Sequence, residues 1–313
     1  MNLVFLGTPS FAVPTLERIV SDRHRLLGVF TQPDRPKGRG GQLAASAVKE
    51  TALRLGLPVF QPERVRRPEA VEQLRAMHPD AMVVVGYGQI IPQSIIDIPR
   101  LGIINVHASL LPRYRGAAPI QWAIAAGETR TGVTTMRIDA GLDTGDILLK
   151  WETDIGPEEN AVELSERLAR AGAGLLAETL AGLEAGDIQP EPQDNSQATL
   201  APILKKEDGA IDWNWPASKI VNRARGFLPW PGAYSYFRGQ VFHLWKASAA
   251  GQSADGKPGR LLPDHKRLFV HCGNRTMLEL LEVQLEGRKR MPAEAFLNGQ
   301  HLNENEALGE TTE

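Results

Sequence analysis

An asparagine and a histidine at the end of an apolar run are the side chains best suited to chemistry. Residues 102–109 read GIINVHAS, so Asn105 and His107 lie two positions apart. On a strand, side chains two apart point to the same face, roughly 6.6 Å apart along the strand. An Asn amide donates to an oxyanion, and a His can donate as well or move a proton. The pair could therefore polarise a carbonyl group lying between the two side chains.

A second polar cluster follows the next apolar run. The segment 138–146 reads IDAGLDTGD and carries Asp139, Asp143 and Asp146, any one of which could reach a neighbouring strand end. A trio of Asn, His and Asp without a Ser or Cys nucleophile favours polarising a carbonyl and moving protons over forming a covalent acyl-enzyme. Judged from the residues alone, a turn-forming Asn105 and a satisfied buried imidazole at His107 stay open as structural alternatives.

Alternating strands and helices must position these residues. We expect strands at 2–7, 26–30, 58–60, 81–88, 102–106, 132–138 and 147–152, and helices at 8–20, 44–56, 68–77, 119–127 and 159–186. The alternation predicts a Rossmann-like, mostly parallel α/β sheet. Ligands of such sheets bind at the carboxyl ends of the strands, which explains why a buried run would end in polar side chains.

The composition changes after residue 186. The segment 187–201 reads DIQPEPQDNSQATLA, which is polar and contains Pro, and it indicates a linker. Short runs with strand alternation follow and predict a small OB-like β-barrel. We therefore expect an α/β domain over 1–186, a linker over 187–207 and a second domain over 208–313, ending in a frayed acidic tail.

Composition excludes several classes of protein. The 313 residues are 42% hydrophobic and 23% charged, which suits a globular protein with two domains. No apolar stretch approaches the roughly 18–20 residues of a membrane span, and the N-terminus lacks a signal-peptide layout. We expect a cytoplasmic protein that binds no membrane. The single cysteine, Cys272, excludes an internal disulfide and is best explained as a small buried apolar residue.

Common cofactor motifs are missing. The first strand is followed by GTPSF, which matches neither the dinucleotide fingerprint nor the phosphate-binding loop. His107 has no second His at ligand spacing, so we expect no metal. Residues 201–290 carry 15 Lys and Arg against 8 Asp and Glu. This excess suits a polyphosphate partner, although scattered surface charge explains it equally well.

Two long segments, NVHASLLPRYRGAAPIQWAI and GVTTMRIDAGLDTGDIL, resemble the signature of the folate-dependent formyltransferases. The elements N-x-H, S-L-L-P, R-G and L-D-T-G-D occur in the order of that family. The segments TQPDRPKGRG, VVVGYGQIIP and GFLPWPGAY are similar to the branch that acts on initiator tRNA, so the resemblance covers nearly the whole chain. It implies transfer of a formyl group from 10-formyltetrahydrofolate to the α-amino group of methionine on initiator methionyl-tRNA.

The same resemblance implies roles for individual residues. Asn105 and His107 would stabilise the oxyanion, and Asp143 would orient His107 and assist proton removal from the amine. The implied folate contacts are Ser109, Leu110, Leu111 and Pro112, and main-chain groups around Tyr87, Gly88, Gln89 and Ile90 and at 139–143. The implied tRNA contacts are Arg35, Lys37 and Arg39 in the basic loop 33–43, and Lys205 and Lys206 in an OB-like tRNA-binding domain. We expect a monomer.

Two rival functions stay open. A sugar-nucleotide formyltransferase, or the hydrolase-like domain of a formyltetrahydrofolate dehydrogenase, would share the N-x-H motif and the Asp loop. Either would tolerate an acidic or short segment where the basic loop 33–43 stands. A non-catalytic RNA-binding protein with a retired Rossmann-like domain is the second rival, but it would have no physical need for the intact trio. The acceptor of the formyl group therefore distinguishes these functions.

Overall fold

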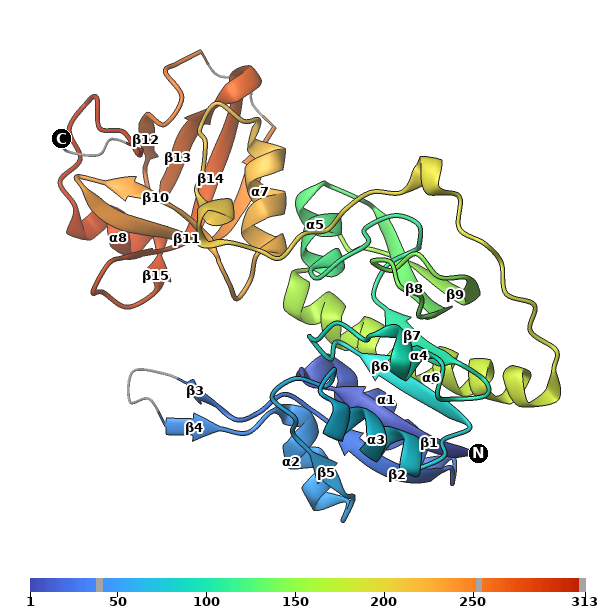
Figure 1. Cartoon of the computed structure of the whole chain (residues 1–313). Coiled ribbons are helices and arrows are strands. Elements are labelled where there is room, and N and C mark those ends of the chain that lie inside the picture. Colours follow the sequence, from blue (N-terminus) through green and yellow to red (C-terminus); the bar gives the residue numbers. More distant parts are fainter. Residues whose placement is uncertain (38–41, 252–254, 310–313) are drawn as a thin grey trace. The chain divides into compact units, whose positions relative to one another are not determined.

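The structure, a computed structural model, describes residues 1–37, 42–251 and 255–309 (Figure 1). Contacts between Cα atoms divide the chain into two compact units. Unit 1 consists of Met1–Pro119, Arg130–Thr153 and Ser165–Pro202, and unit 2 of Ile120–Thr129, Asp154–Leu164 and the chain from Ile203 onward. The boundaries at 186 and 207 stay a proposal. Among the described residues, no helix combines the length and hydropathy needed to cross a bilayer.

A seven-stranded sheet forms the centre of unit 1 in the described part of the chain. Its strand order is β5-β2-β1-β6-β7-β8-β9. The strands are β1 (Asn2–Gly7), β2 (Arg25–Phe30), β5 (Val59–Phe60), β6 (Ala81–Val85), β7 (Ile103–His107), β8 (Arg130–Arg137) and β9 (Ile147–Asp154). The strands from β5 to β7 pair in parallel, and β8 joins β7 in antiparallel orientation. This confirms the predicted Rossmann-like α/β domain.

The helices around this sheet begin where the local sequence favours a start. They are α1 (Val13–Ser21), α2 (Ala47–Arg54), α3 (Pro68–Ala76), α4 (Gln93–Ile96) and α6 (Ala161–Ala185), whose first turn belongs to unit 2 together with most of α5 (Pro119–Ala125). Pro14 occupies the first turn of α1, where its missing N–H is not needed. Ser46 caps α2 by accepting a hydrogen bond from the Lys49 N–H at 3.1 Å.

The two central strands β6 and β7 are buried along their whole length. β6 reads AMVVV and β7 reads IINVH, and all ten residues are buried. β-Branched and aliphatic side chains fit this position because a parallel strand is covered on both faces. The polar residues on β7 are therefore held inside unit 1, at the end of a rigid strand.

Unit 2 contains, in its described part, a six-stranded sheet of order β10-β11-β14-β13-β12, with β15 beside β14. Its elements are η3 (Lys206–Gly209), α7 (Ala217–Gly226), β10 (Ala233–Phe237), β11 (Gln240–Ala250), β12 (Leu261–Asp264), β13 (Arg267–Cys272), η4 (Gly273–Arg275), β14 (Thr276–Leu285), β15 (Met291–Pro292) and α8 (Ala293–Gly299). Phe237 and Phe242 pack against Phe296 in its core. This antiparallel β domain agrees with the predicted OB-like unit.

The single cysteine lies in the core of unit 2. Cys272 is 4% exposed at the end of β13. Burial raises the pKa of its thiol to about 12. The interpretation of Cys272 as a small buried apolar residue is therefore confirmed.

The acidic C-terminal segment is anchored as far as Gly309. Leu308 is buried, and its N–H donates to the Gly259 carbonyl at 2.8 Å. The Glu306 carboxylate accepts two hydrogen bonds from the Arg238 guanidinium, at 3.0 and 2.7 Å. The expectation of a frayed tail over 303–313 is wrong for residues 303–309, because an apolar side chain and a paired carboxylate hold this segment on the sheet. Residues 310–313 lie outside the described residues.

The two ends of the basic loop 33–43 contain short strands that pair with each other as a hairpin. β3 (Arg35–Lys37) pairs in antiparallel orientation with β4 (Gln42–Ala44). At its base, the Lys49 ammonium donates to Asp34 at 2.6 Å, and this hydrogen bond is the main reason why the pKa of Asp34 is lowered. Arg39 lies outside the described residues.

Candidate active site

β7 brings Asn105 and His107 to one site. Both side chains are buried, at 9% and 6% exposure. They share one face of the strand, as the period of two predicts, and both approach the same carboxylate. Because the pairing of β6 with β7 sets Val84 opposite Asn105, the loop that follows β6 lies next to this site.

Asp143 supplies that carboxylate from the loop between β8 and β9. Its Oδ1 accepts a hydrogen bond from Asn105 Nδ2 at 3.3 Å, and its Oδ2 accepts one from the Gly116 N–H at 2.8 Å. His107 Nδ1 lies 3.6 Å from Oδ2, which is ion-pair range rather than a hydrogen bond. The structure thus brings together the three residues predicted to be catalytic.

His107 is oriented by a carbonyl group that the sequence did not indicate. Its Nε2 donates to the main-chain oxygen of Tyr114 at 2.9 Å. A carbonyl oxygen only accepts, so Nε2 carries the hydrogen and Nδ1 faces Asp143. Tyr114 and Gly116 lie in one turn, which therefore holds both the imidazole and the carboxylate. The letters YRG mark this turn in the sequence, but nothing in them shows which atoms it would hold.

The other two aspartates of the loop make hydrogen bonds within the loop and to β8. Asp139 accepts hydrogen bonds from the Gly141 N–H at 3.0 Å and from the Thr144 hydroxyl, so it shapes the loop itself. Asp146 holds β8 through its main-chain oxygen, which accepts the Arg137 N–H at 2.9 Å. Of the three aspartates, Asp143 is the one whose carboxylate contacts Asn105 and His107.

The SLLP motif follows closely after the end of β7. Ser109 is fully buried, and its hydroxyl donates to the Arg113 carbonyl at 2.6 Å. Leu111 is buried as well, whereas Leu110 and Pro112 are partly exposed. The roles of these four residues in folate binding stay a prediction. Ser109 and Leu111 would act by shaping the turn, since their side chains are already enclosed.

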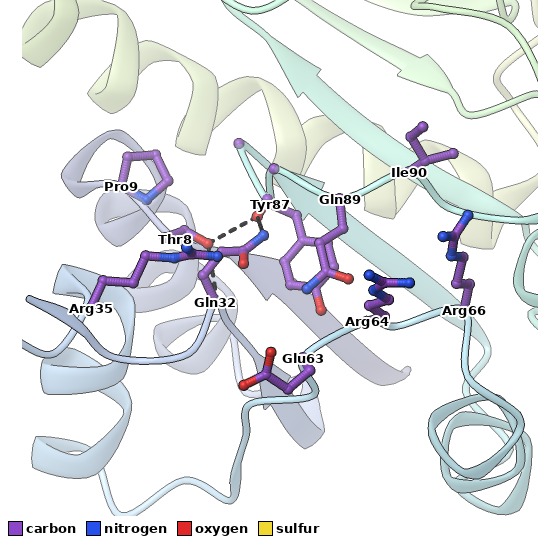
Figure 2. Close-up of a pocket in the computed structure, with 12 residues that line it drawn as sticks. Thr8, Pro9, Gln32, Arg35, Glu63, Arg64, Arg66, Tyr87, Gln89 and Ile90 are labelled. Atoms are coloured by element: carbon purple, nitrogen blue, oxygen red, sulfur yellow. Dashed lines mark hydrogen bonds between the residues drawn. The ribbon is translucent and has the colours of Figure 1, made fainter.

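The loop after β6 forms one wall of a pocket of about 730 Å³ (Figure 2). This wall consists of Gly86–Ile90, and the facing walls come from the loop after β1, from the loop after β2 and from residues 63–66. The Tyr87 carbonyl accepts hydrogen bonds from Thr8 at 3.0 Å and from Gln32 at 3.2 Å. The Tyr87 ring is buried in the core, and this burial raises the pKa of its hydroxyl. Ile90, in contrast, is 87% exposed at the rim.

Arginines surround this pocket. Arg35, Arg64 and Arg66 line it, together with Glu63, and Figure 2 shows Arg64 beside Gln89 and Arg66 near Ile90. Within the described residues, none of these three guanidinium groups has a hydrogen-bond or ion-pair partner. Unpaired guanidinium groups around a concave site favour an anionic ligand.

The residues predicted to bind tRNA fall in both units. Arg35 lies at the base of the hairpin in unit 1, whereas Lys205 and Lys206 are exposed at the start of η3 in unit 2. The backbone of Lys37 belongs to β3. In the described part of the chain, no group of three or more His, Cys, Asp or Glu side chains could hold a metal ion.

Comparisons with known proteins agree over the whole chain. The profile of the family described as Formyl transferase matches residues 1–180, and that of its C-terminal domain matches residues 203–301. A methionyl-tRNA formyltransferase of Solibacter usitatus is 65% identical over 310 residues, covering 99% of both chains. The enzyme of that name from Koribacter versatilis is 59% identical, again covering 99% of both chains.

Solved structures share the fold at low sequence identity. A sugar 3N-formyl transferase determined with dTDP and 5-N-formyl-THF has a TM-score of 0.69 at 17% identity, covering 92% of this chain and 99% of its own. HypX of Aquifex aeolicus in complex with tetrahydrofolic acid has a TM-score of 0.62 at 18% identity, covering 94% of this chain and 46% of its own. These structures show the fold alone, whereas the family profiles and the full-length relatives show that the chain belongs to the methionyl-tRNA formyltransferase family.

Proposed function

We propose that this chain transfers the formyl group of 10-formyltetrahydrofolate to the α-amino group of methionine on initiator methionyl-tRNA, with Asn105, His107 and Asp143 as its catalytic residues. The observation that carries this proposal is the convergence of the three side chains at the end of β7. The full-length relatives named methionyl-tRNA formyltransferase support the choice of acceptor.

The transfer is a direct attack on a carbonyl carbon. The amine nitrogen forms a bond to the formyl carbon, and the carbonyl oxygen becomes an oxyanion. Asn105 Nδ2 keeps a second hydrogen that can donate to this oxygen, and His107 would donate to it once its Nε2–H exchanges the Tyr114 carbonyl for the oxyanion. Collapse of the intermediate breaks the bond between the formyl carbon and the folate nitrogen. The amine loses one proton and the folate nitrogen gains one.

Asp143 and His107 are the groups placed to carry that proton. An α-amino group has a pKa of about 8, so a usable fraction is neutral at pH 7 and needs only modest help to attack. The Gly116 N–H and Asn105 Nδ2 both donate to the Asp143 side chain and so hold it beside the imidazole. A carboxylate next to an imidazole stabilises the imidazolium that forms when the ring takes the proton.

The pocket beside the trio suits the co-substrate. The main chain of Tyr87–Ile90 offers hydrogen-bonding groups for the pterin, and the pocket opens one strand away from Asn105. The unpaired Arg64 and Arg66 suit the anionic groups of the two substrates, which are the glutamyl carboxylates of folate and the phosphates of tRNA. No metal enters this scheme.

The tRNA would contact both units through basic residues. Arg35, Lys37 and Arg39 of the basic loop 33–43 would meet the acceptor end, and Lys205 and Lys206 would contact phosphates from unit 2. A cytoplasmic location and a monomeric state belong to the same proposal. Light scattering of the purified protein tests the monomer.

The decisive experiment offers several acceptors in parallel. Labelled formyl from 10-formyltetrahydrofolate is offered to initiator methionyl-tRNA, to free methionine and to an amino-sugar nucleotide. We expect label on the charged tRNA alone. Label on the sugar nucleotide would refute the proposed acceptor, and a protein that binds tRNA but labels nothing would support the non-catalytic rival.

A further inference from the structure

The side chain of Gln193 joins the loop of Asp143 to a buried arginine. Its amide nitrogen donates to the main-chain oxygens of Asp143 at 2.8 Å and of Gly145 at 2.7 Å. Its amide oxygen accepts from Arg115, at 3.1 Å from Nε and 2.7 Å from Nη2. Two carbonyls at one end and a guanidinium at the other allow one orientation of this amide. Each of its polar atoms thus has a fixed partner.

Arg115 connects this amide to the turn that holds the reacting groups. Arg115 is 6% exposed, and its Nη2 also donates to Asn195 at 2.8 Å. It follows Tyr114, whose carbonyl anchors His107, and precedes Gly116, whose N–H binds the Asp143 carboxylate. Gln193 is therefore bonded to both sides of the site, to the Asp143 loop directly and to the turn 114–116 through Arg115.

The chain around Gln193 lies tightly against the same turn. The Arg115 N–H donates to the Thr199 carbonyl at 2.9 Å, and the Ala201 N–H donates to the Arg115 carbonyl at 2.7 Å. Gly116 has a φ of +119°, and a Cβ at this position would lie 2.7 Å from the Ala201 oxygen. The segment 193–201, which the sequence indicates is a linker, is thus hydrogen-bonded to the catalytic turn.

The backbone of the Asp143 loop is irregular at the catalytic residue itself. Asp143 has a φ of +51°, in the left-handed region, which Asp adopts more readily than most non-glycine residues. Its side chain must point at Asn105 and Gly116 while its carbonyl points away. The bond from Gln193 fixes that carbonyl, and a second bond fixes the Gly145 carbonyl two residues further on. The direction of the carboxylate follows from these two constraints.

We propose that Gln193 is a positioning residue for formyl transfer, which holds the Asp143 loop and the 114–116 turn in register. This inference rests on the proposed catalytic role of Asp143. Gln193 contacts the main chain of the catalytic residue and none of the trio's side chains. Its loss should therefore slow the chemical step and leave substrate binding unchanged.

Gln193→Glu is the most informative variant. The carboxylate keeps its acceptor for Arg115 but has no hydrogen to offer the carbonyls of Asp143 and Gly145. We expect kcat to fall by about 10–100-fold, which is typical of lost support for a catalytic ligand, with KM for both substrates within about twofold. Gln197→Glu is the matched control, because Gln197 is exposed in the same segment and binds Asp194 instead. The control should retain wild-type kcat.

A double-mutant cycle separates positioning from general support of the fold. If Gln193 acts through Asp143, Gln193→Glu should cost almost nothing further once Asp143→Asn is present. Full additivity of the two effects would overturn the proposal. A Gln193→Glu enzyme with normal kcat, or with raised KM and normal kcat, would overturn it as well.

The same cycle distinguishes failure of this inference from failure of the proposed function. An active Asp143→Asn variant would refute the catalytic role of Asp143, and the inference would fall with it. An inactive Asp143→Asn variant beside a normal Gln193→Glu variant would refute the inference alone. If Gln193→Glu and the uncharged Gln193→Met both fail to fold while Gln197→Glu folds, Gln193 is a structural residue and the proposal is wrong.

Discussion

Asp143→Asn changes one oxygen into an amide nitrogen and keeps the shape of the side chain. In the structure, Oδ1 accepts from Asn105 and Oδ2 accepts from the Gly116 N–H. An asparagine has a single acceptor oxygen, so in either orientation its amide hydrogens meet one of these two donors. The variant therefore loses one hydrogen bond to a charged acceptor, and it loses the negative charge beside His107.

The expected loss of rate follows from these two changes. A hydrogen bond to a charged group contributes about 1.5–3 kcal/mol, which corresponds to roughly 10–150-fold in rate where it fixes a geometry needed in the transition state. Loss of a positioned proton acceptor typically lowers the rate by a further factor of roughly 10²–10⁴. We expect kcat to fall by at least about 10³-fold. The Asp143 side chain is 17% exposed, so water can replace part of the lost hydrogen bonding. We therefore expect Tm to fall by less than about 5 °C.

The assay is single-turnover formylation of initiator methionyl-tRNA at saturating 10-formyltetrahydrofolate, with folate affinity measured separately by calorimetry. Asp146→Asn is the control, because Asp146 lies in the same loop and its hydrogen bond with the Arg137 N–H is made by its main-chain oxygen. We expect the control to retain its rate and both variants to bind folate normally. A rate for Asp143→Asn within about tenfold of wild type would refute the reasoning, as would equal losses in the two variants.

Three further predictions concern other parts of the chain. Asn105→Ala should lower kcat about 10²–10³-fold, the loss typical of one oxyanion donor, with a nearly unchanged Tm; a loss below tenfold would contradict its role. Arg64→Ala and Arg66→Ala should each raise KM about tenfold for the substrate whose anion the arginine binds, which corresponds to roughly 1.4 kcal/mol of binding free energy. Initial-rate titration of each substrate at two salt concentrations identifies the substrate that each arginine binds. Arg238 lowers the pKa of Glu306 in the folded chain by donating hydrogen bonds to its carboxylate. The pair therefore stabilises the folded chain fully above the pKa of an unfolded Glu, about 4.3. This stabilisation is lost as the pH falls through the lower pKa that Glu306 has in the folded chain. Acid titration of Tm should therefore show a steeper loss for wild type than for Glu306→Gln, and parallel curves would contradict this.

Regular elements with a strong period could be predicted from the sequence. The period of two of a strand predicts that Asn105 and His107 share one face, and the structure confirms this. The strand AMVVV was equally clear, since a continuous run of β-branched residues is typical of a strand buried on both faces. Only the family resemblance singles out Asp143 among the three aspartates, because an irregular loop has no period from which side-chain directions follow.

Contacts between irregular segments could not be predicted. The anchor of His107 is a main-chain carbonyl, and every residue has one, so side-chain types carry no signal for Tyr114. Gln193 lies 50 residues from Asp143 in a polar, Pro-containing segment, a composition that solvated linkers share. The order of segment 303–309 also cannot be read from its acidic composition, because it depends on the burial of Leu308 and on the hydrogen bonds between Glu306 and Arg238.

The burial of the single cysteine gives this protein an internal reporter. Cys272 is 4% exposed with a thiol pKa of about 12, so an alkylating reagent near pH 8 meets almost no thiolate in the folded chain. Any reaction therefore measures how often the strand at Cys272 opens to solvent. Because Cys272 is the single cysteine of the sequence, all of the alkylation reports on this one position. The labelling rate with and without tRNA would report whether RNA binding suppresses opening of unit 2, without the introduction of any probe.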